Sequence, residues 1–456
     1  MSRESSSLPA AFRSASSIAV AAFIACSAFA GAAHGQTLQE LYNAARGYDA
    51  TYLSARALAD SAPYRAEQAK ALLRPNVALS SAATHTQTEP PSGVERTTNA
   101  LSASLTGRQP LFNRSNSVTV EQAQKSLDSS RADLDTAEQD LIVRVAQAYF
   151  DVLAAYDALG TTQASKAAIT EQLAAAKRNF EVGTATITDT REAQARSDLA
   201  TAQEIAANND LRTKRITLDL LVGRSDVTPR PLKTPVVLPQ DLLSQDVTTW
   251  VNQAQAVHPA VRRAQLALDV AQLETQKARA GHLPTVDLVG SFGPNRQTGS
   301  GAALSAAGPG TTTSASIGIQ LNLPLYTGGS VQNRIKETLV LEDKSREDLD
   351  AAKRAVSQTT RQVYSSLESG RAQVNALEAA ESSSLLALEA TQLGYRVGVR
   401  VNIDVLNSQT QLFTTRQNLA KARYDVLTGS LRLRQAAGQL RPEDILLIER
   451  LLSPTP

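Results

Sequence analysis

The segment VLNSQTQLFTTRQNLAKARYDVLTGSLRL, residues 405–433, decides the fold of this chain. Every seventh residue in it is apolar: Val405, Leu412, Leu419, Val426 and Leu433. A period of seven is slightly shorter than two turns of an α-helix, so a helix that keeps this period must wind around a neighbour with a left-handed twist. The segment therefore predicts a coiled-coil helix, which we place at about residues 402–437.

A second apolar row lies beside the first in the same segment. Its members are also spaced by seven: Leu406, Phe413, Ala420 and Leu427. Two adjacent rows give a helix two packing faces, which suits a helical wall or tube better than a two-stranded rod. The preceding helix, at about residues 328–397, keeps the same period. At a rise of 1.5 Å per residue, a helix of about 70 residues spans roughly 100 Å, which is longer than any compact domain of this size allows.

The prolines of the chain are distributed unevenly. None lies between Pro110 and Pro229, and none lies between Pro324 and Pro442, so that two proline-free stretches of nearly equal length result. Because proline interrupts helices, both stretches are expected to be helical throughout, apart from one turn in the middle. Their similar length indicates an internal duplication.

Matching residues support this duplication. Gly183 and Asp189 precede Gly398 and Asp404 by the same number of residues. We expect a first repeat at residues 36–222, with a strand hairpin at about 76–110, a long helix at about 113–182 and a returning helix at about 187–222. The second repeat, residues 246–440, has its hairpin at about 285–325 and its helices at about 328–397 and 402–437. A proline-rich linker, residues 223–245, joins the repeats, and residues 441–456 form a C-terminal tail.

The first 35 residues have the pattern of an export signal. Arg3 and Arg13 precede an apolar run at residues 18–30, and Ala33-His34-Gly35 fits a cleavage site of small residues. An alternative interpretation is a lipid-modified cysteine at Cys26. After this leader, no apolar segment reaches the length of about 18 residues that a membrane-spanning helix needs. If the exported chain enters a membrane, we expect it to do so as strands.

Two regions in each repeat alternate apolar residues with small or polar ones. In the clearest region, every second residue is apolar: Ile317, Ile319, Leu321 and Leu323. This alternation is typical of strands that cross an outer membrane with the apolar face toward lipid. Four strands cannot close a barrel, and open strand edges are not tolerated in hydrocarbon. Three chains would supply twelve strands, enough for a barrel with a pore.

Charge and composition exclude several functions. The chain has 46 Lys and Arg against 44 Asp and Glu, a net charge of +2, so nothing favours binding to nucleic acid. Three histidines follow the leader, His85, His258 and His282, and none has a partner at a spacing typical of metal ligands. No nucleophile elbow, phosphate-binding loop or dinucleotide fingerprint occurs. We therefore expect no catalytic residue, metal or cofactor.

The motif at residues 394–406, GYRVGVRVNIDVL, resembles the TolC family of outer-membrane efflux and secretion channels. The first repeat carries a counterpart in NFEVGT at residues 179–184, and both repeats share a strand-to-helix corner, QPLF at 109–112 and LPLY at 323–326. The resemblance covers residues 36 to about 452. It implies a mainly helical homotrimer, with a shared twelve-stranded barrel in outer-membrane lipid and a helical barrel in the periplasm. The linker and the short terminal helices would form a belt midway along that barrel.

The resemblance also implies a gate at the periplasmic tip. Two polar links close this tip in the family, and the matching pairs here are Tyr395 with Asp189 and Arg400 with Thr188. A phenol or guanidinium that donates to an oxygen forms a directional contact, which can break reversibly. The turns at Gly183 and Gly398 would lie beside the grooves in which an adaptor docks.

The constriction of the family carries two acidic rings on the last helix. Asp404 matches the first ring, whereas Asn407 stands at the second position, where an aspartate is usual. No other carboxylate lies between Val399 and Thr410. Because like charges that converge on an axis repel and attract cations, we expect a gate with one acidic ring and weaker block by multivalent cations.

These features favour a passive exit duct of a tripartite efflux pump or type I secretion system. The resemblance implies that it works with a periplasmic adaptor protein and an inner-membrane transporter, which supplies the energy. The alternative is a periplasmic coiled-coil structural or adaptor protein with two soluble hairpins. An adaptor would need one helical hairpin between β-rich domains, whereas this chain repeats a helix-and-strand unit.

Overall fold

The computed structural model describes residues 35–89, 91, 93, 95–233, 245–301 and 308–453. Residues 1–34 of the expected export signal, with Cys26, residues 234–244 of the linker between the repeats, and part of the loop near residue 300 lie outside these residues. In the described part of the chain, no helix combines the length and the apolar character that crossing a bilayer requires.

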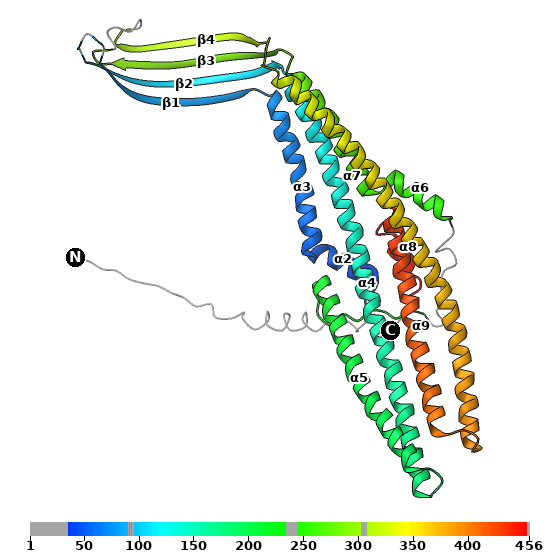
Figure 1. Ribbon diagram of the computed structural model, residues 1–456. Coiled ribbons are helices and arrows are strands. Elements are labelled where there is room, and N and C mark those ends of the chain that lie inside the picture. Colours follow the sequence, from blue (N-terminus) through cyan, green and yellow to red (C-terminus); the bar gives the residue numbers. More distant parts are fainter. Residues whose placement is uncertain are drawn as a thin grey trace, which may run out of the picture.

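Two very long helices run through the molecule. They are α4, Arg114–Glu181, with 68 residues, and α8, Ser330–Arg396, with 67 residues. Each turns back into a shorter antiparallel helix, α4 into α5, Ile187–Val222, and α8 into α9, Asn402–Ala436. Figure 1 shows these two helical pairs side by side, with both turns at one end of the molecule.

Shorter helices cover the other half of the long ones. α3, Ala50–Lys70, packs along α4, and α7, Pro259–Ala280, lies between α4 and α8. The upper half of the molecule is therefore a layer in the order α3, α4, α7, α8, and in the lower half α5 and α9 replace α3 and α7 (Figure 1). This single curved layer is the helical wall that the two apolar rows predicted.

A four-stranded antiparallel sheet lies at the end opposite the helical turns (Figure 1). Its order is that of the sequence: β1, Asn76–Thr88; β2, Arg96–Phe112; β3, Thr285–Thr298; and β4, Gly310–Asn322. The hairpins of the two repeats are thus joined by the pairing of β2 with β3. The corner at Pro110-Leu111-Phe112 lies inside β2, where the register shifts between Pro110 and Phe112, because proline has no N–H for the ladder.

The apolar row of α9 with a spacing of seven residues is buried in a coiled-coil seam. Val405, Leu412, Leu419, Val426 and Leu433 are all buried, most of them with α8 residues such as Leu349, Val356 and Leu367. In the second row, Leu406 packs with residues of α4 and α5, and Leu427 lies in the cluster around Tyr149 and Phe150 of α4. The prediction that α9 packs on two sides is confirmed.

Polar contacts also join α9 to α4. The Tyr424 hydroxyl donates to Asp157 over 2.6 Å, and the Gln417 amide donates to Thr162 over 3.0 Å. Burial raises the pKa of the Asp157 carboxyl, while the bond from Tyr424 opposes this rise. The interface between the two helical pairs is therefore a mixed apolar and polar one.

Each repeat begins with a helical region that is divided into two helices. In the first repeat, α2, Leu38–Tyr48, ends at Asp49, whose side chain caps α3 by accepting from the Tyr52 N–H over 2.8 Å. In the second, α6, Val247–Val257, ends at His258, whose Nδ1 accepts from the Ala260 N–H at the start of α7. In the first repeat, the short helical turn η1, Ala71–Leu73, follows α3 and leads into β1.

The first and last segments that the structure describes meet near the middle of α4. Gln36 pairs with Pro229 and Leu232 with Leu452 in short bridges, and the Tyr149 hydroxyl donates to the Arg230 carbonyl over 3.0 Å. α2 and the last helix, α10, Asp444–Glu449, bury Leu41 and Ile448 in the same cluster. These segments form a collar of short elements midway along the helices.

Candidate functional site

The tips of the two helical pairs are closed by the same backbone motif. Gly183 and Gly398 have φ angles of 81° and 82°, which residues with a side chain rarely adopt. Their neighbours complete the turn, because the Thr184 N–H donates to the Asn179 carbonyl over 2.8 Å and the Val399 N–H donates to Gly394 over 2.9 Å. A Cβ on either glycine would meet no atom within 4 Å, so backbone conformation alone requires glycine here.

The helices that return from these turns begin differently. Asp189 belongs to a capping box: its carboxylate accepts from the Thr186 N–H over 3.0 Å and from the Thr186 hydroxyl over 2.7 Å. Asp404 holds the same position in the second repeat, but its helix starts at Val401, which has no capping side chain. The carboxylate of Asp404 instead faces Arg400 at 3.6 Å and is one-third exposed.

The two predicted links are not formed within the single described chain. The Tyr395 hydroxyl accepts from the Asn179 amide over 3.1 Å, whereas Asp189 binds Thr186. Arg400 pairs with Asp404, and Thr188 is exposed. The pairs Tyr395–Asp189 and Arg400–Thr188 therefore stay predictions for an assembled tip. Asn179 was missed as a partner, although it stands in the motif of the first repeat that matches the region of Tyr395.

Asn407 lies on the exposed side of α9. Its Oδ1 atom accepts a hydrogen bond from the Arg196 guanidinium of α5 over 3.1 Å. The chain separates these residues by 211 positions, so no local pattern could have brought Arg196 to attention. Next to Asn407, Leu406 is almost fully buried among the helices of the other pair. This end of α9, where we expect the gate, therefore contacts the α4–α5 pair.

The sheet is the second region with a functional pattern. The paired residues Leu79, Leu105, Phe292 and Ala315 form a row across one face. The next row, on the opposite face, consists of Ala78, Thr106, Ser291 and Ser316. The apolar face leaves large side chains exposed, among them Ile317 at 81%. One face is thus suited to lipid and the other to water.

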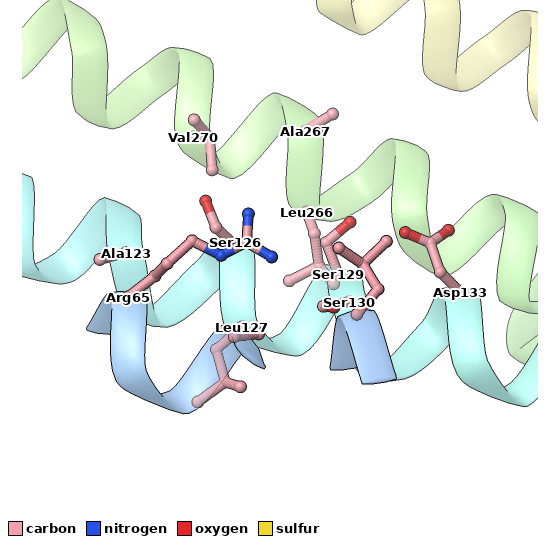
Figure 2. Close-up of a pocket in the computed structure, with 12 residues that line it drawn as sticks. Arg65, Ala123, Ser126, Leu127, Ser129, Ser130, Asp133, Leu266, Ala267 and Val270 are labelled. Atoms are coloured by element: carbon pink, nitrogen blue, oxygen red, sulfur yellow. The ribbon is translucent and has the colours of Figure 1, made fainter. Parts of the chain in front are cut away.

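A groove of about 580 Å³ runs along α4 between α3 and α7. Figure 2 shows it lined by short side chains such as Ala123, Ser126 and Ser129. Of its two charged lining residues, Asp133 is paired with Arg263 at 3.1 Å and Arg65 donates to Ser61. Small residues at the seam leave this space, and its lining contains no group of residues suited to catalysis or to holding a metal.

Comparison with known proteins agrees with this architecture. The model of the family Outer membrane efflux protein matches residues 41–224 and 250–439. Outer membrane protein TolC of Vibrio cholerae is 31% identical over 411 residues, which cover 90% of this chain and 92% of that protein. Alkaline protease secretion protein AprF of Pseudomonas aeruginosa is 34% identical over 314 residues, or 68% of this chain and 64% of that protein.

The fold is also that of a solved structure. The outer membrane protein VceC of Vibrio cholerae superposes with a TM-score of 0.74 at 18% identity, covering 88% of this chain and 96% of that chain. The two segments of the family match each contain a hairpin and a pair of long helices, as the duplication predicted. Since the family match covers most of the chain and the TolC relative spans nearly all of it, this protein belongs to the outer membrane efflux protein family.

Proposed function

We propose that three copies of this chain form an exit duct of the outer membrane. Their sheets would join in one barrel in the lipid, and their helices would form one tube in the periplasm. The observation that carries this proposal is the sheet, which has an exposed apolar face and, in the described residues, a strand at each edge that pairs on one side only. Unpaired backbone groups are costly in hydrocarbon, so such a sheet needs further copies to close it.

The duct would conduct substrates passively. The sequence has no nucleotide-binding motif, and the family is one of membrane channels, so we infer no catalytic activity. Energy would come from an inner-membrane transporter, and a periplasmic adaptor would dock beside the turns at Gly183 and Gly398. The family description names efflux, and AprF is named for secretion of a protease, so the substrates would be small molecules or polypeptides of a type I system.

The tip of the helical tube would be the gate. Asp404 is the candidate for the acidic ring, because its carboxylate does not cap its own helix, unlike that of Asp189. Tyr395 is the candidate for a breakable link, since it joins α8 to α4 through a single hydrogen bond to Asn179. Asn407 would leave the constriction with one ring of charge.

The proposal can be tested with purified protein from outer-membrane fractions. We expect a trimer that resists sodium dodecyl sulfate and that conducts ions in planar bilayers. Deletion of the gene in its host should abolish export either of a drug or of a secreted polypeptide. Which of the two is lost would separate efflux from secretion. A monomer found in the periplasmic fraction, without conductance, would favour the coiled-coil adaptor or structural protein instead.

A further inference from the structure

One contact ties the first turns of α9 to the opposite helical pair. The Arg196 guanidinium, on α5, donates to the Asn407 amide oxygen, on α9, over 3.1 Å. α5 packs mainly on α4, and α9 packs mainly on α8. The two pairs meet chiefly where α4 packs on α9, and this bond joins them directly through α5. Arg196 is half-buried, whereas Asn407 is exposed.

Leu406, the residue before Asn407, anchors the same part of α9 through apolar contacts. It is 1% exposed and packs into an apolar cluster supplied by α4 and α5, namely Ile169, Leu173, Ala176, Ala193 and Ala200. About one helical turn before Leu406, the Gln172 amide of α4 donates to the Asn402 side chain. Leu406 therefore lies between two polar contacts, and all three hold the same end of α9 on the α4–α5 pair.

The interface between α9 and the α4–α5 pair contains buried polar groups that make it easier to separate. Asn402 and Gln409 are buried on the side of α9 that carries Leu406, and the Asn402 Nδ2 and Gln409 Oε1 atoms have no hydrogen-bond partner among the residues described. Buried amide atoms without partners weaken an interface relative to an apolar one of equal area. Because these unpartnered atoms offset part of the gain from burying Leu406, the bond from Arg196 is a sizeable part of what holds this end of α9.

We propose that Arg196 is a positioning residue of the gate, and that the amide at position 407 keeps its latch on α9 weak enough to open. An aspartate at 407 would turn this bond into an ion pair with a charge-assisted hydrogen bond, which is stronger. The departure from an acidic residue at 407 then has a second effect besides the loss of a charged ring: it loosens the closed state. This inference rests on the proposed function, because it assumes that the tip closes a duct.

Four forms of the full-length trimer test the latch in planar bilayers: wild type, Arg196→Gln, Asn407→Asp and the double variant. Arg196→Gln should raise the time-averaged current about two- to fivefold, the range expected for loss of one exposed charged contact. Asn407→Asp should lower the current by a similar factor, but only while Arg196 is present. In the double variant the new carboxylate is unpaired, so block by divalent cations should appear there and be weak in Asn407→Asp alone.

Arg191 supplies the matched control. It lies on the same helix as Arg196 and is exposed, and Arg191→Gln removes the same charge, so this variant should conduct like wild type. If Asn407→Asp lowers the current equally with and without Arg196, or if Arg191→Gln acts like Arg196→Gln, the latch is refuted. Those outcomes would mean that charges at position 407 or on α5 change the current only through the electrostatic potential of the pore.

A cross-linking experiment keeps this inference separate from the proposed function. The sequence contains one cysteine, Cys26, which can be replaced by serine. In that background, the pair Arg196→Cys and Asn407→Cys should be joined within one chain by a short bifunctional maleimide, whereas Arg191→Cys with Asn407→Cys should not. Absence of the first cross-link overturns the latch even if the channel conducts. A wild-type protein that cross-links as expected but never conducts would instead overturn the proposed function.

Discussion

Asp189 and Asp404 hold equivalent positions in the two repeats, yet their carboxylates have different partners. The reason lies three residues upstream, where Thr186 offers a hydroxyl and Val401 does not. In the first repeat the hydroxyl and the carboxylate complete a capping box, whereas in the second the carboxylate meets only Arg400, at 3.6 Å. A single hydroxyl thus decides which copy of the duplicated aspartate is held in a helix cap and which is left to pair with a neighbouring arginine.

The hydroxyl of Tyr395 provides a prediction at this scale. Tyr395→Phe combined with Arg400→Ser removes the bond from Asn179 and the cation beside Asp404, so we expect higher conductance in bilayers from an intact trimer. Trimer stability in sodium dodecyl sulfate serves as the check on folding. Arg396→Ser, which removes an equal charge from an exposed position nearby, should change the conductance little.

The partner of Tyr395 can be identified in the same assay. If the observed bond holds the tip, Asn179→Ala should raise conductance as Tyr395→Phe does, and the two changes together should add nothing further. If the family pairing holds instead, Asp189→Ala should show this behaviour and Asn179→Ala should not. Unchanged conductance in every variant would remove Tyr395 from the gate.

At the scale of helices and strands, the sequence predicted what depends on local periodicity. The buried row from Val405 to Leu433 follows from spacing alone, and the glycine turns follow from backbone conformation. The helix breaks at Asp49 and His258 do not follow from periodicity, because each depends on a side chain that caps the next helix. The partners of the tip residues were missed for another reason: Asn179 lies 216 positions from Tyr395, and nothing local specifies which residues meet across two packed helical pairs.

Asp49 shows how such a break is stabilised. Its carboxylate caps α3 and also receives two bonds of 2.9 Å from the Arg144 guanidinium of α4. The hydrogen bonds from Arg144 hold the pKa of the Asp49 carboxyl below its ordinary value, against the opposing effect of burial. One side chain therefore both starts the helix and fixes its direction along α4.

This arrangement predicts an order of stabilities. Asp49→Ala loses the cap and the ion pair and should lower the local opening free energy of α3 by about 1–3 kcal/mol, whereas Asp49→Asn keeps a capping oxygen and should cost less. Hydrogen exchange of the α3 amides measures both. Equal losses in the two variants would show that the cap contributes nothing.

The pH dependence of this junction has a definite sign. Since the folded pKa of Asp49 is depressed, its charge stabilises the fold fully above the unfolded pKa, near 3.8, and this contribution is lost as the pH falls through the lower folded value. In acid, protection of α3 should therefore decline more in wild type than in Asp49→Asn. An equally steep decline in both would assign the effect to other carboxylates.

At the scale of the whole molecule, the wall and the sheet pose the same problem of unfinished packing. A single chain builds one curved layer of helices and one sheet whose edge strands β1 and β4 each have a neighbour on one side within the described residues. Large apolar side chains, such as Leu79, Ile317 and Ile319, remain exposed on one face of the sheet. Closure by further copies and insertion in lipid would solve the edge and the face together.

Two adjacent residues of β4 test that solution. Ile317 belongs to the apolar face and Ser316 to the polar face, since side chains alternate along a strand. If the apolar face meets lipid, Ile317→Lys should cost about 2–4 kcal/mol per chain near the membrane centre and should reduce the amount of trimer in the outer-membrane fraction. Ser316→Lys places the same charge one residue away but toward the water-filled side, so trimer should form normally and the conductance should change instead. Equal assembly of the two variants would mean that neither face of the sheet contacts lipid, and the chain would then need another way to cover its open edges.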